Sequence, residues 1–416
     1  MPLSLDIVSQ IVNVQWGGEQ FLYSGADGMF GSDTGKTWEK LAKSVPAISL
    51  AFIDDVWIGV SQTGTWKSKD GAQTWEKLSV PSTFNTVMDI IAMKPKGVDD
   101  EGKEKKGVFA AWVSEDASGD NQLVYTSHDL GDTWTVALTI PYLVGTDGNE
   151  TINGISGCGD HFFVCTSRAA TVYHLGDGMI YSSSDGSAFT STTVFGPGTD
   201  RTPPVDPNAP SWGYAATAVG FDEKTRTYMA IGGKQGGAVV NVVETALIYT
   251  TSTSGSFSQT EGTIAVSASQ ILNTGDSIAA IGSAAAGGAG MHATGHLLSR
   301  YDGAVGFVSG DLKAGFIPGT QQQLQAMGGV GGYVASFCFN KGGSAGSTED
   351  DSEDKNGVFG CVAFGTDMKG GIYIAKPGEA FAKTHDGTPI DIGGPGNPSP
   401  RGAVAVGKVS LEGSTP

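Results

Sequence analysis

The chain has 416 residues, a formal net charge of −18 and 63 Gly residues, and only 16% of its residues are charged. The negative charge disfavours a nucleic-acid partner and an anionic membrane surface, because both are bound mainly through Lys and Arg. An uninterrupted apolar run of about 18 residues is absent from the sequence, so we expect no membrane insertion. The composition predicts a protein rich in turns and strands.

The first predicted elements form a hairpin. The start, "MPLSLDIVSQIVNVQW", lacks the basic and long apolar regions of a secretion signal, and we interpret it as the first strand of the fold. In "MFGSDTGKTWEKL" a strand ends at Phe30, a turn contains Asp33 and Gly35, and Trp38 begins the next strand. Asp can accept hydrogen bonds from backbone N–H groups two or three residues on, Gly supplies a positive φ, and the aromatic ring packs back as a buried plug.

The same hairpin recurs along the chain. The second copy contains Asp70, Ala72 and Trp75, and the third, "SHDLGDTW", contains Ser127, Asp129, Gly131 and Trp134. Weaker copies are "IYSSSDGSAF" with Asp185 and Phe189, "IYTTSTSGSF" with Gly255 and Phe257, "LLSRYDGAVGF" (297–307) and "IYIAKPGEAF" (372–381). The sequence therefore predicts seven copies of one turn between two strands.

Each hairpin follows two further strand-like runs, which predicts a repeated unit of four strands. The first unit comprises "IVNVQW", "QFLYSG", "GMFGS" and "TWEKL". Small-residue runs such as "YAATAVGF" suit inner strands crowded round an axis. We therefore predict an all-β fold, a single seven-bladed β-propeller of four-stranded antiparallel blades over residues 1–390. Residues 391–416 are expected to form a C-terminal arm, whose run 402–411 can pair with N-terminal residues to close the ring.

The turn pattern resembles a known repeat. "SHDLGDTW" (127–134) matches Ser-x-Asp-x-Gly-x-x-Trp, the Asp-box or bacterial neuraminidase (BNR) repeat, and "SDTGKTW" and "SKDGAQTW" match it nearly. The match is clear over residues 31–138. The resemblance implies a sialidase-like propeller fold and places the boxes on outer turns away from the active face, so we assign the Asp, Gly and aromatic residues of the turns a structural role.

The enzymatic activities of that family are not supported by this sequence. A sialidase needs an arginine triad, the first member near the N-terminus, and a Tyr nucleophile with a Glu partner; here the first arginine is Arg168. Xyloglucan-degrading relatives use a cleft between two propellers, and this chain contains one. We therefore expect no catalytic residue. A glycosidase with another acidic pair stays open as an alternative, because 43 acidic residues always supply some pair.

Metal and cofactor sites are not expected. The four cysteines, Cys158, Cys165, Cys338 and Cys361, lack zinc-site spacing, and their state is either buried thiols or cross-strand disulfides. The acidic inserts at 97–107 and 340–357 lack the alternating ligands of an EF-hand and are interpreted as solvated loops.

Long loops on the face opposite the Asp-box turns form the candidate binding face. Its residues are suited to protein or glycan contact: Tyr142, Arg168, Tyr173, His174, Arg201 and Trp212. We predict a non-catalytic scaffold or interaction protein that binds other proteins of an assembly or surface glycans and can form an oligomer. A bacteriophage virion component (tail, nozzle or decoration) or an adhesin fits this acidic β-protein. The expected location is the virion or the extracellular space, with the cytoplasm as the alternative, and the competing function is a secreted glycoside hydrolase.

Overall fold

The computed structural model describes residues 14–25, 28–141, 150–168, 177–196, 212–222, 227–236 and 244–257, and then the short segments 262–263, 284–286, 295–299, 305–309, 314–316, 333–340, 358–364, 369–375, 382–389 and 403–404. The described strands form seven antiparallel sheets with the chain running from one edge of each sheet to the other, and one sheet gains a fifth, parallel strand. The described part of the chain contains a single 3₁₀ turn, η2 (Ser82–Thr86), and no α-helix.

The sheets are numbered in chain order. Sheet 1 contains β1 (Val14–Gly17), β2 (Gln20–Gly25), β3 (Gly28–Ser32) and β4 (Glu39–Lys40). Sheet 2 contains β5 (Ser49–Ile53), β6 (Val56–Ser61), β7 (Gly64–Ser68) and β8 (Glu76–Lys77). Sheet 3 contains β9 (Val87–Met93), β10 (Val108–Val113), β11 (Asn121–Ser127) and β12 (Thr135–Pro141). Sheet 4 contains β13 (Glu150–Cys158), β14 (His161–Arg168), β15 (Asp177–Ser183) and β16 (Thr190–Phe195).

The later sheets follow the same order. Sheet 5 contains β17 (Trp212–Asp222), β18 (Thr227–Gly236), β19 (Glu244–Ser252) and β20 (Gly262–Thr263). Sheet 6 contains β21 (Ala284–Ala286), β22 (Gly295–Ser299), β23 (Val305–Ser309) and β24 (Ala314–Phe316). Sheet 7 contains β25 (Tyr333–Asn340), β26 (Val358–Phe364), β27 (Lys369–Ala375) and β28 (Ala382–Pro389), to which β29 (Ala403–Val404) adds.

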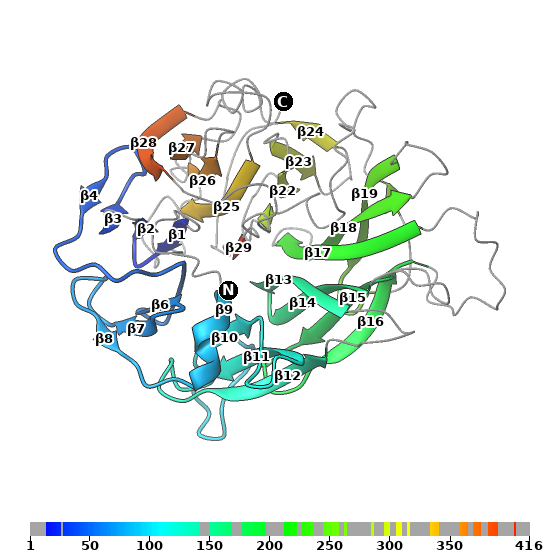
Figure 1. Ribbon diagram of the computed structural model, residues 1–416, viewed down its shortest axis with the longest axis horizontal. Helices are drawn as coiled ribbons and strands as arrows, with labels where there is room; N and C mark the ends of the chain where they lie inside the picture. The colour runs from blue at the N-terminus through cyan, green and yellow to red at the C-terminus, as the bar shows by residue number, and fades with distance from the viewer. Residues whose placement is uncertain are drawn as a thin grey trace.

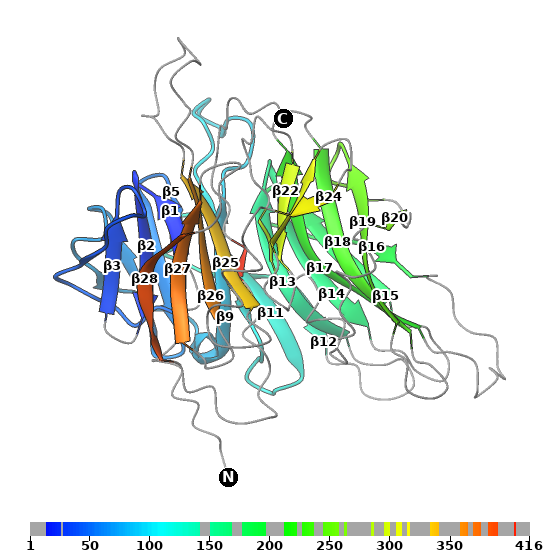
Figure 2. The same cartoon turned by 90° about the horizontal axis from the view of Figure 1, so that it is seen from above.

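The sheets stand round a common axis, which makes the fold a β-propeller. Figure 1 shows the first strands β1, β9, β13, β17 and β25 near the centre and the last strands β4, β8, β12, β16, β24 and β28 toward the rim. Figure 2 shows the same ring turned by 90°. Because the strands alternate in direction, one face of the ring carries the turns between first and second and between third and fourth strands. We call this the turn face. The opposite face, the loop face, carries the connections from second to third strands and from sheet to sheet.

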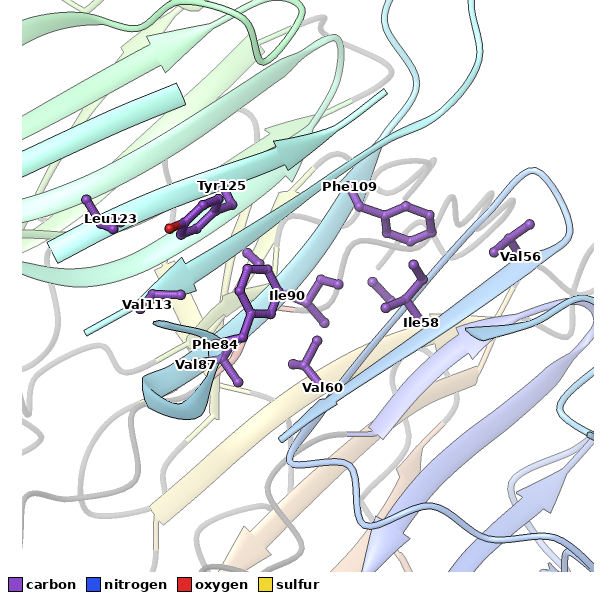
Figure 3. Packing of buried hydrophobic residues seen from close by; sticks show 12 residues of the cluster. Val56, Ile58, Val60, Phe84, Val87, Ile90, Phe109, Val113, Leu123 and Tyr125 are labelled. Atoms are coloured by element: carbon purple, nitrogen blue, oxygen red, sulfur yellow. The ribbon is translucent and has the colours of Figure 1, made fainter. Parts of the chain in front are cut away.

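Apolar side chains fill the space between neighbouring sheets. Figure 3 shows the cluster between sheets 2 and 3, in which Ile58 and Val60 of β6 face Phe109 of β10 and Ile90 of β9. All four side chains are almost completely buried. The alternation of strand residues thus sends one set of side chains into each inter-sheet layer, and burial of these layers provides the main driving force for the ring.

The inner strands approach each other closely. A Cβ atom added at Gly157 on β13 would lie 2.8 Å from the carbonyl oxygen of Ala92 on β9. Polar contacts link other neighbours: Asn153 Nδ2 donates to Ala216 O over 2.8 Å, from sheet 4 to sheet 5. The close contact between backbones near the axis explains the glycine at position 157.

The turns of sheets 2 and 3, which we call Ser–Asp turns, share one hydrogen-bond pattern. In the third copy Ser127 Oγ donates to Asp129 Oδ1 over 2.8 Å and accepts from Gly131 N over 2.8 Å. Asp129 Oδ1 also accepts from Thr133 N at 2.8 Å, and Trp134 Nε1 donates to Gly131 O at 3.1 Å. The second copy repeats the Ser and Asp bonds with Ser68 and Asp70, and hydrogen bonds from Thr74 hold the pKa of Asp70 near 2. In both copies the Asp accepts from a backbone N–H four residues on, and the Ser accepts from the N–H of the Gly or Ala.

The first and fourth copies are shorter versions of this turn. In the first, Ser32 Oγ rather than Asp33 accepts from Gly35 N, at 2.7 Å, and Trp38 Nε1 donates to Gly35 O at 3.0 Å. In the fourth, Ser183 Oγ accepts from Gly186 N at 2.9 Å, and Asp185 accepts from the backbone N–H two residues on. Phe189 packs against the cluster between sheets 3 and 4.

One hairpin prediction is wrong by one strand. The sixth copy, "LLSRYDGAVGF" (297–307), was expected to join the third and fourth strands of its sheet, but it joins β22 to β23, the second and third strands. An Asp-Gly pair favours any tight hairpin, so it does not identify which hairpin of a blade it belongs to. The seventh copy joins β27 to β28 as expected, although its turn lies outside the described residues.

Sheets 1 and 7 meet where the ring closes. Tyr23 OH is hydrogen-bonded to the imidazole of His385 on β28, and Trp38 Nε1 lies 3.3 Å from Thr384 Oγ1. The C-terminal strand β29 pairs in parallel with β25 and also contacts β13 and β21, so it lies at the centre of the ring (Figure 1). The C-terminal run was expected to pair with N-terminal residues; its described strand β29 pairs with β25 instead, and residues 1–13 and 405–416 are outside the described residues.

The Ser–Asp turn of sheet 3 offers a stability test. Gly131 has a φ of +93°, and an added Cβ would lie 2.2 Å from Ile58 Cδ1. Gly131→Ala is expected to lower the free energy of unfolding by about 2–4 kcal/mol, because left-handed strain adds to a core clash. The measurement is urea unfolding followed by Trp fluorescence.

Gly119→Ala is the matched control, since Gly119 has a φ of +78° with nothing within 4 Å of an added Cβ. It should lower the free energy of unfolding by only about 1–2 kcal/mol, the cost of the backbone strain alone. If both variants lowered the free energy of unfolding equally, the clash with Ile58 would make no contribution to the loss of stability.

Candidate binding face

The described part of the loop face carries a buried polar network in sheet 4. Glu150 is the first residue of β13, Arg168 the last of β14 and Asp177 the first of β15, and the backbones of these three residues pair directly. The network therefore lies where the connections 142–149 and 169–176 leave the sheet. The connection 142–149 ends at Glu150, and the connection 169–176 runs from Arg168 to Asp177.

The carboxylate of Glu150 is the centre of this network. Its Oε1 accepts hydrogen bonds from Thr166 Oγ1 and from Tyr181 OH, each over 2.8 Å. Its Oε2 accepts from Arg168 Nη2 over 3.2 Å, which makes an ion pair. The side chain of Glu150 is only 4% exposed, whereas that of Arg168 is 31% exposed. A buried carboxylate requires such donors, because an uncompensated charge away from water is very costly.

The strand register explains why these residues meet. On paired antiparallel strands, residues directly opposite each other project to the same side of the sheet, and so do residues two apart along a strand. Thr166 is two residues before Arg168, and Tyr181 is four residues after Asp177. All of them therefore share one side of sheet 4, the side that packs against sheet 3. Gln122 of β11 completes the contact: its Nε2 donates to Glu150 O at 3.0 Å, and its Oε1 accepts from Ile152 N at 3.0 Å.

The network has the chemistry of an anchor. Burial, and then the nearby Glu150 carboxylate, raise the pKa of Tyr181 above its usual range, so its hydroxyl donates a hydrogen bond as a neutral phenol. A Tyr nucleophile would require the opposite shift. Tyr181 and Arg168 each donate a hydrogen bond to Glu150, so both carboxylate oxygens of Glu150 are engaged.

The structure describes only some of the predicted binding residues. Arg168 lies in the network, with its guanidinium partly exposed at the loop face. Trp212 begins β17, and its side chain is not among those described. Tyr142, Tyr173, His174 and Arg201 lie outside the described residues. Glu150 and Tyr181 were not predicted from the sequence. The signal for them was the position of Glu150 at the start of an inner strand, where a lone acidic residue needs a partner.

A second polar cluster, on the turn face, links sheets 3, 4 and 5. Asp160 Oδ2 lies 2.5 Å from Lys96 Nζ, and Asp160 Oδ1 lies 2.8 Å from His161 Nδ1. Tyr228 OH donates to Asp160 Oδ1 and accepts from the backbone N–H of Asp160 at 3.2 Å. The ring of His161 is covered by Gly255, where an added Cβ would be 3.1 Å away. No sequence pattern indicates this cluster, because its members come from three repeats.

The charge of Asp160 is stabilised by this cluster. Burial acts to raise its pKa, but the hydrogen bonds from Lys96, Tyr228 and His161 outweigh burial and hold the pKa well below its usual range. The same contacts act on Tyr228, whose pKa is raised by burial and by its hydrogen bond to Asp160. The cluster therefore contains an ionised carboxylate and a neutral phenol at neutral pH, which suits an inter-blade tie.

The described residues bear on the cysteines, on metal ligands, on membrane-crossing helices and on the acidic inserts. Cys158 and Cys165 are buried thiols, and burial raises the pKa of Cys165 far above its usual value. No group of three or more potential metal ligands occurs in the described ranges. Likewise, the part of the chain that the structure describes contains no helix long and apolar enough for a membrane crossing. The acidic insert 97–107 is folded, with a bridge between Val98 and Glu104, whereas residues 341–357 of the other insert lie outside the described residues.

Comparisons with known proteins give structural similarity only. No protein-family model and no curated protein matches the sequence. An α-L-arabinanase from Penicillium chrysogenum is similar with a TM-score of 0.41 and 10% identity, covering 85% of this chain and 88% of that chain. Sqt1 from Saccharomyces cerevisiae is similar with a TM-score of 0.42 and 8% identity, covering 92% of this chain and 86% of that chain. The six-bladed Aleuria aurantia lectin is similar with a TM-score of 0.35 and 9% identity, covering 92% of this chain and 96% of that chain. At these identities and TM-scores, the functions of these proteins do not carry over to this chain.

Proposed function

We propose that this protein is a non-catalytic scaffold, a seven-bladed β-propeller of the Asp-box type, whose loop face binds other proteins of an assembly. The observation that carries the proposal is the Glu150 network. Its carboxylate accepts three hydrogen bonds, its Tyr is a neutral donor, and its position fixes the ends of two long connections. Rigid strand ends below variable loops are the usual construction of a binding surface.

The blade number and the repeat type belong to this proposal. The order of four strands in each described sheet, and the shared Ser and Asp hydrogen bonds of the turns after Ser68 and Ser127, support one blade per sheet and an Asp-box ancestry. Arg168 and the predicted residues Tyr142, Tyr173, His174, Arg201 and Trp212 are the proposed contacts of the loop face. Surface glycans are the second class of ligand that these aromatic and basic side chains suit.

The proposed role is that of a bacteriophage virion component (tail, nozzle or decoration) or of an adhesin, in the virion or the extracellular space. The support is compositional: a Gly-rich, acidic chain with 25 Lys and Arg residues against 43 Asp and Glu residues stays soluble at high copy number. The proposal requires that the tagged full-length protein assembles into particles or oligomers of fixed stoichiometry. Purification of the protein only as a free monomer would contradict it.

A glycan array distinguishes the proposed scaffold from the competing function, a glycoside hydrolase with an unrecognised acidic pair. The purified full-length protein is applied, and each spot is read by mass spectrometry for bound protein and for cleaved sugar. We expect no cleavage on any spot; retention without cleavage would add glycans to the ligands of the loop face. Cleavage that is abolished by one Asp or Glu substitution would replace the scaffold by an enzyme.

A further inference from the structure

The outer strand of sheet 3 differs from the outer strands of sheets 1 and 2. β12 is seven residues long, whereas β4 and β8 are two residues long and each consists of one Glu and one Lys. Short or charged outer strands discourage another chain from pairing with an edge. β12 is neither short nor charged, because "TVALTIP" carries no charged side chain; its two interruptions are a bulge at Ala137 and the terminal Pro141.

The edge of β12 is also open. Thr135, Val136, Thr139 and Pro141 are exposed, and Ile140 is the one fully buried side chain of the strand. Val136 is 49% exposed, which makes it one of the large apolar residues at the surface of the described chain. β16 in sheet 4 is similarly uncharged, but its last two residues, Val194 and Phe195, are completely buried. No described strand pairs with the outer side of β12.

Acidic turns flank both ends of this edge. At its beginning lies the Ser–Asp turn with Asp129 and Asp132, of which Asp132 is paired with Lys67 at 2.6 Å. At its end, Pro141 pairs with Asn121, which follows the turn containing Glu115, Asp116 and Asp120. Hydrogen bonds from Asn121 and Ser118 hold the pKa of Asp116 well below its usual range, so this end carries negative charge at neutral pH.

We propose that the β12 edge is a docking site for an extended segment of a partner protein, with an uncharged middle and a basic residue at each end. The backbone groups of β12 would continue the sheet, and the acidic turns would attract the basic ends. A second copy of this chain fits less well, since antiparallel pairing of two β12 strands would bring the acidic turns of the two copies together. This surface is on the rim of the ring, and its Pro141 end reaches the loop face, because the turn before Asn121 joins the second and third strands of sheet 3.

The probe is a fluorescent peptide, Lys-Thr-Val-Thr-Val-Thr-Lys, with a partner peptide that has Glu at both ends. Binding to the full-length protein is measured by fluorescence polarisation, and the site by hydrogen–deuterium exchange mass spectrometry. We expect the Lys-ended peptide to bind and to slow exchange over residues 135–141. The Glu-ended peptide should bind at least about tenfold more weakly, because the acidic turns repel it.

Val136→Lys tests the edge itself, since a Lys in the middle of an edge strand opposes pairing. It should weaken binding of the Lys-ended peptide by at least about tenfold and leave the melting temperature nearly unchanged, because the side chain is exposed. Val98→Lys is the matched control: Val98 is 59% exposed on the insert at 97–107 and receives the same charge. It should change binding by less than about twofold.

Three results would overturn the proposal. The first is absence of peptide binding, and the second is peptide binding at another place, shown by protection from exchange outside residues 135–141 and by an equal effect of the two Lys variants. The third is concentration-dependent dimerisation that Val136→Lys abolishes, without peptide binding, which would assign the edge to a second copy.

Discussion

Replacing Asp89 by Asn is expected to stabilise the protein at pH 8 by up to about 4 kcal/mol while leaving its stability at pH 4 nearly unchanged. Asp89 lies on the inner strand β9 and is almost completely buried. Burial raises its pKa to about 7, against the opposing effect of hydrogen bonds from Ser49 and from the backbone N–H of Ile90. Ser49 Oγ lies 2.6 Å from Asp89 Oδ1, so sheets 2 and 3 are joined through this carboxyl group.

The direction follows from the two states of the carboxyl group. In the unfolded chain the group loses its proton near 3.8, the ordinary pKa of an Asp side chain, whereas in the fold it keeps the proton until about pH 7. Between these values the folded state binds more protons, so the free energy of unfolding falls as pH rises, by about 1.4 kcal/mol per pH unit. Above pH 7 the decrease is complete. Asn carries no charge and keeps an acceptor for Ser49, so this decrease should disappear.

Thermal and urea unfolding at pH 4, 6 and 8 measure the effect. Asp33→Asn is the control, because Asp33 is exposed on the first turn and its replacement removes the same charge. Histidine titration affects both variants and the native protein alike, and it cancels in the comparison. An Asp89→Asn variant that tracks the native protein at all three pH values would show that Asp89 is ionised in the fold at little cost.

The repeat pattern made much of the architecture predictable from sequence. Ser127, Asp129, Gly131 and Trp134 lie close in the chain, and their hydrogen bonds depend only on local backbone geometry, so the motif indicates the turn directly. Four-strand order followed because each such turn had two strand-like runs before it. Where the turn residues had decayed, as in "LLSRYDGAVGF", the same reasoning assigned the hairpin to the wrong pair of strands.

The polar networks were not predictable in the same way. Asp160 and Tyr228 are 68 residues apart, and Tyr23 and His385 are 362 residues apart, so their contacts depend on how whole sheets face each other. The sequence near Glu150 does not indicate which strands carry the residues that donate hydrogen bonds to it. Arg168 was selected from sequence as a basic residue beside a long loop, and its pairing with a buried carboxylate depends on the register of β13 and β14.

Removing that carboxylate, in Glu150→Ala, is expected to lower the free energy of unfolding by about 3–5 kcal/mol, because a partly buried Arg168 and two hydroxyl donors lose their acceptor. The guanidinium Nε of Arg168 already lies buried without a hydrogen-bond partner. Glu150→Gln should be milder, at about 1–3 kcal/mol, since one oxygen remains for Thr166 and Tyr181 while the amide nitrogen faces the guanidinium.

Urea unfolding distinguishes this network from an ordinary surface charge when Glu39→Ala is measured beside it. Glu39 is exposed on the two-residue strand β4, and its replacement should cost no more than about 0.5 kcal/mol. Hydrogen–deuterium exchange should also show faster exchange at the ends of β13 and β14 in Glu150→Ala, because those ends lose the bonds that hold them. If Glu150→Ala cost no more than Glu39→Ala, the network would not be the anchor of the loop face, and the proposed scaffold would lose the observation that carries it.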